Sequence, residues 1–463
     1  MVPRPHPTLR SGSPAAHPLG VRHGQDHARL RRQDRADGRC RPPARRPVVR
    51  AAAGPSAADD LDGVVVVGAG QAGFRTAASL RECGYAGRIA LVGDEDTAPY
   101  ERPPLSKAYL TGDGDEDLLW LRSSEYFVRQ SIDVLADRVT AIDRAARTVR
   151  LAGGGVLGYG HLVLATGARP RGLAVPGGEL RGVRPLRTLA EARILRDELR
   201  RAAEVVVVGA GFVGLEFAAA ARALGCAVTV VELRDRPLAR AVGERTAEHF
   251  TLLHRRQGTR LLFGRRVARF LDDGTGAVAG VELTDGSRLP ADVVVVGAGV
   301  EPRTELAAAA GLEVDDGIVV DARLRTGDPA ISAIGDCAAF PHPAAGRRIR
   351  LESVQNAVGH ARLVAERLTG QERDYGDLPW FWSEQFSSTL QIAGLADGHD
   401  TEVVLGEWPE AFSVLLFRAD RLVAVETVNR PPDHMAARRL LTKGVPLTPA
   451  TAAEGGFTLT PVP

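Results

Sequence analysis

The sequence predicts an α/β protein with two Rossmann-like dinucleotide-binding domains followed by a C-terminal α+β domain. A run of valines leading into a Gly-x-Gly-x-x-Gly turn occurs at residues 64–73 and again at residues 205–214. After residue 378 the pattern changes to short stretches in which apolar and polar residues alternate. Strands buried in parallel sheets are rich in valine, whereas antiparallel strands with one exposed face alternate.

The first glycine motif follows Val64–Val67 and places glycines at Gly68, Gly70 and Gly73, with a helix expected next. In such a turn the first glycine permits a tight bend and the second lets a pyrophosphate approach the backbone. The third lets the helix pack closely on the strand, and free N–H groups at the helix start favour phosphate charge. Glycine turns also occur as plain strand–helix corners, but the order strand, turn, helix favours nucleotide binding.

The second motif is a complete copy of the first, after the strand Val205–Val208. A third valine strand, Val293–Val296, ends in a glycine turn that lacks the last glycine. Two full motifs predict two dinucleotides, and a flavin with its hydride donor is the simplest such pair. The predicted cofactor-binding residues of this second unit are Gly209, Gly211, Phe212, Val213, Gly214, Glu232, Gly297 and Gly299.

Acidic residues at the ends of the second strands are the predicted ribose ligands. In the first unit the strand is followed by Asp94 and Glu95, and the sequence leaves the choice between them open. In the second unit Glu232 ends the strand, where a carboxylate accepts from the 2′-hydroxyl and repels a 2′-phosphate. This favours NADH over NADPH, although Arg234 and Arg236 follow closely and weaken the preference.

Composition narrows the class of protein. A length of 463 residues allows about three domains, and 44% hydrophobic residues with 51 glycines suit an α/β protein. The net charge is +2, but residues 1–60 carry twelve arginines against five aspartates, which leaves the remainder at −5. The body is therefore not predicted to bind nucleic acid. No apolar run approaches the ~20 residues that a membrane helix needs.

The four cysteines are scattered without a Cys-x-x-Cys pair, at Cys40, Cys83, Cys226 and Cys337. This spacing does not support a metal site, an iron–sulfur cluster or a redox-active disulfide, and a reducing cytoplasm is the expected location. Residues 1–60 are dense in Arg, Pro, His and Ala and show no helical or strand period. We predict that they are disordered; a translated upstream stretch and a basic arm for an acidic partner are the alternatives.

Several further elements bear on the site. Residues 132–151 alternate as a small antiparallel ribbon would. A strand ends at Asp336, where an acid could accept hydrogen bonds from ribityl hydroxyls. Ser353 is a candidate cap for a helix that runs to about residue 368, and Ser106 is a candidate cap for an earlier one. If the later helix points at a flavin, its dipole would stabilise charge on the reduced ring.

Three stretches together carry a family resemblance. They are Glu-Arg-Pro-Pro-Leu-Ser-Lys at residues 101–107, Ala-Ile-Gly-Asp-Cys at residues 333–337 and Pro-Trp-Phe-Trp-Ser-Glu-Gln at residues 379–385. With the double glycine motif, they resemble the FAD-dependent, NADH-linked ferredoxin reductases that serve bacterial cytochromes P450 and Rieske dioxygenases. The resemblance covers roughly residues 62–443 and does not include residues 1–60.

The resemblance implies a fold like that of glutathione reductase. The FAD-binding domain would be split over residues 61–172 and 300–377, with an NAD-binding domain at 173–299 inserted in it and a C-terminal domain at 378–463. The residues expected to contact FAD are Gly68, Gly70, Gln71, Ala72, Gly73, Asp94, Glu95, Arg102, Lys107, Val139, Ala165, Thr166, Gly167, Arg169, Asp336, Ser353, Val354 and Trp382.

The resemblance also matches Lys107 and Glu216 to an ion pair beside flavin N5, and these are the predicted catalytic residues. Glu216 closely follows the third glycine of the second motif, on the helix expected beneath the nicotinamide. The alternative is a structural surface bridge, worth at most ~1 kcal/mol.

A 2Fe–2S ferredoxin with an acidic surface is the implied partner, docking near Arg350, Trp380 and Trp382. A basic neighbourhood formed by Arg347, Arg348 and Arg350 would steer the encounter, although core packing of the tryptophans and a solvated loop are the alternatives. The resemblance weakly suggests a monomer or a loose homodimer.

The expected mechanism places nicotinamide C4 against flavin N5 and exposes the flavin edge to the partner. Other acceptors remain open, namely rubredoxin, a quinone or a nitrite reductase. A redox-signalling flavoprotein like apoptosis-inducing factor, and a flavin-stabilised binding module without turnover, are the alternatives from other classes.

Overall fold

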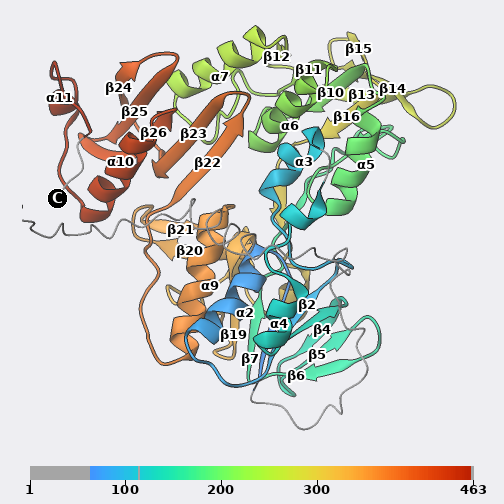
Figure 1. The fold of residues 1–463 in the computed structure, drawn as a ribbon, viewed down its shortest axis with the longest axis vertical. Helices are drawn as coiled ribbons and strands as arrows, with labels where there is room; N and C mark the ends of the chain where they lie inside the picture. Colours follow the sequence, from blue (N-terminus) through green and yellow to red (C-terminus); the bar gives the residue numbers. More distant parts are fainter. Residues whose placement is uncertain (1–62, 113–114, 460–463) are drawn as a thin grey trace, which may run out of the picture. The chain divides into compact units, whose positions relative to one another are not determined.

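The structure is a computed structural model that describes residues 63–112 and 115–459. The predicted disorder of residues 1–60 lies outside these residues. The described part of the chain forms two five-stranded parallel sheets, a five-stranded antiparallel sheet and four smaller ones (Figure 1). None of its helices combines the length and apolar character that crossing a bilayer requires.

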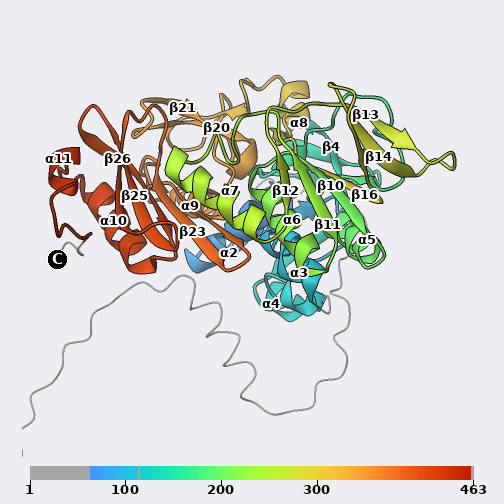
Figure 2. The same ribbon diagram turned by 90° about the horizontal axis from the view of Figure 1, so that it is seen from above.

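The first parallel sheet has the strand order β19-β7-β1-β2-β3. Its strands are β1 (Val64–Val67), β2 (Ile89–Gly93), β3 (Ile132–Ala136), β7 (His161–Leu164) and β19 (Ile331–Ala333). All four valines of β1 are buried, because β1 lies in the middle of the sheet. Helices α2 (Gln71–Glu82) and α9 (Val354–Leu368) pack side by side, as both ribbon views show (Figures 1 and 2). A distant segment therefore completes the unit that the first glycine motif begins.

The prediction of an antiparallel ribbon over residues 132–151 is wrong for its first strand. β3 pairs in parallel with β2, with Ile132 opposite Ile89. Only β4 (Val139–Asp143) and β5 (Thr148–Leu151) form the antiparallel ribbon, together with β6 (Val156–Gly158). Alternation of apolar and polar residues indicates that one face of a strand is partly exposed. An edge strand of a parallel sheet and an antiparallel ribbon both have such a face.

The second parallel sheet repeats the arrangement with the order β12-β11-β10-β16-β9. Its strands are β9 (Val183–Arg184), β10 (Glu204–Val208), β11 (Ala227–Val231), β12 (Arg260–Leu262) and β16 (Val293–Val296). Its helices are α5 (Leu189–Leu199), α6 (Phe212–Ala223) and α7 (Glu244–Arg256). An antiparallel sheet beside it contains β13 (Val267–Asp272), β14 (Val278–Leu283) and β15 (Arg288–Pro290).

Short elements connect these units. Two small sheets contain β8 (Ala168–Pro170) with β17 (Val300–Pro302), and β18 (Ile318–Val319) with β20 (Ala338–His342) and β21 (Arg347–Ile349). The remaining short helices are α3 (Ala108–Thr111), α4 (Ser124–Arg129) and α8 (Glu305–Ala309). Single 3₁₀ turns are η1 (Pro103–Ser106), η2 (Glu116–Leu118) and η3 (Gly335–Cys337).

The C-terminal part is an antiparallel sheet in the order β22-β23-β26-β25-β24. Its strands are β22 (Trp380–Gln385), β23 (Ser388–Gly394), β24 (Thr401–Glu407), β25 (Ala411–Arg418) and β26 (Arg421–Val428). Helix α10 (Pro431–Lys443) packs on this sheet, and α11 (Pro449–Ala452) follows (Figures 1 and 2). α10 begins at Pro431, and Pro431 and Pro432 occupy its first turn, where proline is favourable. Each sheet takes its strands from one predicted domain, and the domain boundaries stay a prediction.

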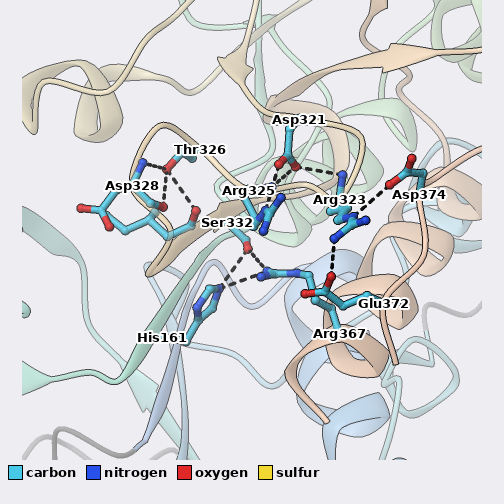
Figure 3. A network of polar contacts seen from close by, with 11 residues as sticks. His161, Asp321, Arg323, Arg325, Thr326, Asp328, Ser332, Arg367, Glu372 and Asp374 are labelled. Carbon is cyan, nitrogen blue, oxygen red and sulfur yellow. Dashed lines mark hydrogen bonds and ion pairs between the residues drawn. The ribbon is translucent and has the colours of Figure 1, made fainter. Parts of the chain in front are cut away.

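A network of polar side chains lies at the end of the first parallel sheet that is opposite its glycine motif (Figure 3). Arg367, in the last turn of α9, donates to Ser332 Oγ at 2.6 Å, and His161 Nε2 lies 2.9 Å from the same oxygen. Burial and the neighbouring Arg367 lower the pKa of His161 to about 3, so its ring is neutral. On the same face Arg323 pairs with Asp374 at 3.0 Å. The network joins α9 to β7 and β19, and thereby fixes the helix that lies beside α2.

Candidate active site

The first glycine motif forms a concave turn between β1 and α2. Gly68 has a φ of 109°, and a Cβ there would lie 2.1 Å from the Ala165 carbonyl oxygen. A Cβ on Gly73 would lie 1.8 Å from the Gly68 oxygen, whereas one on Gly70 would meet no atom within 4 Å. Gly70 caps α2 without a side-chain hydrogen bond. The turn therefore requires glycine for its own shape and leaves open space beside uncapped N–H groups, which suits a pyrophosphate.

The second motif has the same geometry between β10 and α6. Gly209 has a φ of 106°, and a Cβ on Gly214 would lie 2.2 Å from the Gly209 oxygen. Gly211 caps α6 without a side-chain bond and faces open space. Gly297 and the following turn close in from β16, since a Cβ on Gly209 would lie 2.4 Å from the Gly297 oxygen. The residues of both turns thus fit a dinucleotide.

The two strand-end acids are held differently. Glu232 accepts from the backbone N–H of Ala210 at 2.6 Å and from that of Arg234 at 2.8 Å. Its carboxylate therefore lies against the second glycine turn, where a ribose would be bound. Glu95 instead accepts from Arg102 Nη2 at 2.6 Å and from the hydroxyl of Tyr100 at 2.6 Å.

Asp94, the alternative to Glu95, is partly exposed and pairs with Arg303 at 2.9 Å. The structure thus gives each of the two acids a cation, and the identity of the ribose ligand stays a prediction.

Arg102 is the centre of a polar cluster at the edge of the first unit. Its Nη1 donates to Tyr100 Oη at 2.9 Å and to the Arg187 carbonyl at 2.7 Å. The Tyr100 oxygen also accepts from the backbone N–H of Leu189 at 2.9 Å. Burial raises the pKa of Tyr100, so its hydroxyl stays protonated and donates to Glu95. Arg102, a predicted FAD contact, is thereby fixed to the segment that leads into α5.

Asp336 lies in η3, directly after β19, and binds an arginine that sequence reasoning missed. Its Oδ2 accepts from Arg187 Nη2 at 2.7 Å. The backbone N–H of Gly335 donates to His360 Nδ1 at 3.1 Å, which ties the turn to α9. Ser353 caps α9 as predicted, accepting from the N–H of Asn356 at 3.1 Å.

The predicted pair of Lys107 and Glu216 meets in the structure. Lys107 Nζ lies 3.1 Å from Glu216 Oε1, and the two side chains are 17% and 6% exposed. The segment that carries Lys107 leaves the first unit, because α3 packs against both α5 and α6 of the second (Figure 1). The pair therefore joins the two nucleotide units and is more buried than a surface bridge.

Ser106 does not cap α3, which corrects the expectation. The cap position of α3 is Lys107, without a side-chain bond. The Ser106 hydroxyl instead donates to Glu216 Oε2 at 2.6 Å, and Ser383 donates to Glu216 Oε1 at 2.7 Å. Sequence reasoning missed both serines as partners of Glu216, although Ser106 precedes Lys107 and Ser383 belongs to the tryptophan stretch.

The two tryptophans of β22 stack near a further arginine. The ring centroids of Trp380 and Trp382 are 5.6 Å apart, and the Arg438 guanidinium lies 4.7 Å from the Trp380 centroid. The backbone N–H of Trp380 donates to Gln355 Oε1 at 3.2 Å, so β22 begins against the first turn of α9.

The predicted basic neighbourhood is neutralised by acids. Arg347 pairs with Asp397 at 2.7 Å, and Arg348 pairs with Asp315 at 3.3 Å. Arg350 is 11% exposed and pairs with Glu352 at 2.6 Å. A cluster of arginines in sequence therefore does not form a net positive patch, because their acids come from other segments.

Apart from Arg169, the other predicted contacts lie at the ends of strands and helices in the two nucleotide units. Arg169 is 44% exposed and its guanidinium pairs with Glu301 at 2.6 Å and also with Glu305. Thr166 donates through Oγ1 to the Arg303 carbonyl at 2.7 Å. Helix α2 begins with Gln71 and Ala72, α6 begins with Phe212 and Val213, and α9 begins with Val354. Strand β4 begins with Val139, β7 is followed by Ala165 and Gly167, and β16 is followed by Gly299.

Comparison with known proteins identifies the family. Residues 62–361 match the family described as pyridine nucleotide-disulphide oxidoreductase, and residues 380–462 match the reductase C-terminal family. The chain belongs to the pyridine nucleotide-disulphide oxidoreductases, and within them to the ferredoxin reductases.

Rhodocoxin reductase from Rhodococcus erythropolis is 50% identical over 86% of this chain and 93% of its own length. Putidaredoxin reductase from Pseudomonas putida is 41% identical over 84% and 93%.

Solved structures agree. A ferredoxin reductase from Rhodopseudomonas palustris superposes with a TM-score of 0.84, at 49% identity over 86% of this chain and 98% of that one. The covalent complex of putidaredoxin reductase with putidaredoxin gives a TM-score of 0.83, at 40% identity over 87% and 98%. The predicted fold class, family and enzyme class are thereby confirmed, as are FAD and NADH as cofactors.

Proposed function

We propose that this reductase passes electrons from NADH through FAD to a 2Fe–2S ferredoxin that serves a cytochrome P450 or a Rieske oxygenase. The observation that carries the proposal is the buried pair of Lys107, beyond the first glycine turn, and Glu216, just after the second. A residue from each nucleotide unit meets there, which is where two dinucleotides would exchange a hydride. FAD supplies the chemistry when bound, since a flavin accepts two electrons as hydride and releases them singly.

The chain itself supplies binding and orientation. The open faces at Gly70 and Gly211 would hold the two pyrophosphates, and Glu232 would hold the NADH ribose. Asp336, fixed by Arg187, would hold the ribityl chain. The start of α9, capped by Ser353, would direct its dipole at the flavin ring. Lys107 and Glu216 are the proposed catalytic residues beside flavin N5.

We propose that the ferredoxin docks over Trp380, Trp382 and Arg350, and that Arg438 belongs to the same surface. Within residues 63–112 and 115–459 no acidic side chain pairs with Arg438, and burial lowers the pKa of its guanidinium. It is thus the better-placed cation for an acidic ferredoxin, because the charge of Arg350 is already balanced by Glu352. The supporting relative is putidaredoxin reductase, whose covalent complex with putidaredoxin has a closely similar fold. We further propose a cytoplasmic monomer or weak dimer.

The test is NADH-driven cytochrome c reduction with and without a 2Fe–2S ferredoxin. We expect the rate to depend strongly on the ferredoxin. The substitutions Trp382→Ala and Arg438→Ala should weaken this dependence, and Arg350→Ala should weaken it less. The dependence should weaken as salt is raised, because salt screens the attraction between a basic docking surface and an acidic ferredoxin. Rapid flavin bleaching by NADH without ferredoxin dependence would contradict the partner and direct the search to rubredoxin, quinones or nitrite reductase.

If the reduced protein instead reoxidises slowly with every acceptor, a signalling role would replace turnover. Failure of NADH to bleach the flavin would overturn the hydride-transfer proposal itself.

A further inference from the structure

Glu216 is the acceptor at the centre of a buried hydrogen-bond network. Its Oε2 accepts from Ser106 Oγ at 2.6 Å. Its Oε1 accepts from Ser383 Oγ at 2.7 Å and lies 3.1 Å from Lys107 Nζ. The donors come from two segments distant in the sequence from Glu216, the Ser106–Lys107 pair before α3 and Ser383 on β22. A carboxylate has only acceptor sites, so it satisfies all three donors at once.

A second layer orients Ser383. Gln385 Nε2 donates to Ser383 Oγ at 3.2 Å, and Gln385 Oε1 lies 2.9 Å from His254 Nε2. An amide oxygen can only accept, so His254 carries its proton on Nε2. Burial lowers the pKa of His254 to about 4, which keeps the ring neutral near pH 7. Each hydrogen bond therefore points in one direction, from His254 through Gln385 and Ser383 to Glu216.

The same strand has two different faces. Along β22, Trp380 and Trp382 alternate with Phe381, Ser383 and Gln385. Phe381 packs on Phe212 of the second glycine motif, with ring centroids 4.5 Å apart. β22 thus presents its tryptophans on one side and fixes the second nucleotide unit on the other.

We propose that Ser106 and Ser383 are positioning residues for the hydride-transfer site, and that Gln385 and His254 orient Ser383. This inference rests on the proposed function of the Lys107–Glu216 pair. A lysine side chain has four rotatable bonds, and a single ion pair leaves it much freedom. Two hydroxyl donors, one on each oxygen, fix the carboxylate plane and with it the place of the ammonium. Preorganised charge of this kind acts on the reacting atoms without rearrangement during the reaction.

A purely structural role makes a different prediction. Removing a buried serine hydroxyl would then lower stability and leave the electronic properties of the flavin unchanged. Ser388 on β23 provides the matched control, because it is 4% exposed and its hydroxyl lies 3.1 Å from His249 Nε2. Ser388→Ala removes a buried serine–histidine contact in the same sheet without removing a donor to Glu216.

The experiment compares Ser383→Ala, Ser106→Ala, Ser383→Thr and Ser388→Ala in the full FAD-containing chain. The readouts are the FAD midpoint potential during photoreduction, the pH profile of flavin reduction by NADH in stopped flow, and the thermal unfolding midpoint. We expect Ser383→Ala and Ser106→Ala to shift the potential and to slow flavin reduction about tenfold. This is less than the roughly hundredfold to thousandfold loss on removing a donor that touches a reacting charge, because the two serines act through Glu216. Ser383→Thr should restore both properties, and Ser388→Ala should change the unfolding midpoint alone.

The inference is overturned if Ser383→Ala and Ser388→Ala give the same potential and the same pH profile. Photoreduction uses neither NADH nor ferredoxin, so the potential reports on the network even where the proposed electron acceptor is wrong. Conversely, a shifted potential in a protein that shows no ferredoxin dependence would support the positioning role and contradict the proposed partner.

Discussion

The two nucleotide units share a backbone and differ in what holds their acids. Gly68 and Gly209 have φ values of 109° and 106°, and the third glycine of each turn faces the first glycine's oxygen. Glu232 accepts from the backbone N–H groups of Ala210 and Arg234, whereas Glu95 accepts from the side chains of Tyr100 and Arg102, which follow it in the same loop. Local sterics therefore make the two turns alike, and the acids differ because one is bonded to backbone N–H groups and the other to side chains.

A second difference concerns what holds a helix of each unit in place. α2 is fastened by α9 within the first unit. In the second unit, the N–H groups at the start of α7 donate to carboxylates of the C-terminal sheet. The N–H of Gly243 donates to Glu426 Oε1 at 2.8 Å. Glu402 likewise accepts from the N–H of Glu244 at 3.0 Å. The C-terminal sheet thus holds the N-terminus of α7 in the second nucleotide unit.

The largest expected effect separates the two turns. Gly73→Ala and Gly214→Ala place a methyl group 1.8 Å and 2.2 Å from a backbone oxygen, which must move. We expect Gly73→Ala to lose bound FAD, and Gly214→Ala to keep FAD while its NADH affinity falls about a hundredfold, since overpacking typically costs ~1–3 kcal/mol. Flavin absorbance per protein and NADH titration measure the two. Gly172→Ala, where a Cβ meets nothing within 4 Å, is the control, and full flavin content in Gly73→Ala would contradict the assignment.

The next effect tests the attachment of α7. Burial raises the pKa of Glu426 to about 7 from 4.5, so the folded state favours its protonated form. Its contribution to stability is present at low pH and is lost as the pH rises from 4.5 through about 7. Glu426→Gln should therefore gain stability relative to the native chain between pH 5 and pH 8, by an amount on the order of a few kcal/mol.

Unfolding midpoints at the two pH values measure this difference. Glu402→Gln is the comparison variant, because Glu402 accepts a hydrogen bond from the N–H of Glu244 in α7 and is partly exposed. If the unfolding midpoints of Glu426→Gln and the native chain differ by the same amount at every pH, Glu426 does not titrate in this range.

A moderate effect is expected at the acid of the second unit. Glu232→Ala removes the acceptor for the Ala210 N–H and the proposed acceptor for the ribose hydroxyl. We expect the KM for NADH to rise about tenfold and the preference over NADPH to fall, the usual size for one charged hydrogen bond. Flavin content should not change, because the first turn is untouched. An unaltered preference would assign cofactor choice to Arg234 and Arg236.

The smallest effect addresses the acid of the first unit. Asp94→Asn removes a partly exposed pair with Arg303, which is worth at most ~1 kcal/mol. Glu95→Gln weakens two 2.6 Å contacts that fix Arg102 and Tyr100. We expect FAD dissociation to accelerate more in Glu95→Gln than in Asp94→Asn. The reverse order would identify Asp94 as the ribose ligand.

Sequence patterns located the elements better than their pairings. The valine strands, both glycine turns and the Ser353 cap depend on neighbours within a few residues, and the structure has them. The direction of β3 was missed, because alternation does not encode which strand lies alongside. The neutralised arginines were missed for a related reason: Asp315 and Asp397 lie far from Arg348 and Arg347 in the sequence.

By itself the sequence determined the fold class and the two dinucleotide turns. The turns follow from glycine sterics, and the ion pair of Lys107 with Glu216 was reached through resemblance to the reductases. Only the tertiary structure decided what holds Glu216. Ser106 and Ser383 are 110 and 167 residues away along the chain. A hydroxyl becomes a donor to a particular carboxylate only when folding brings the two within hydrogen-bond distance, and no local pattern records that approach.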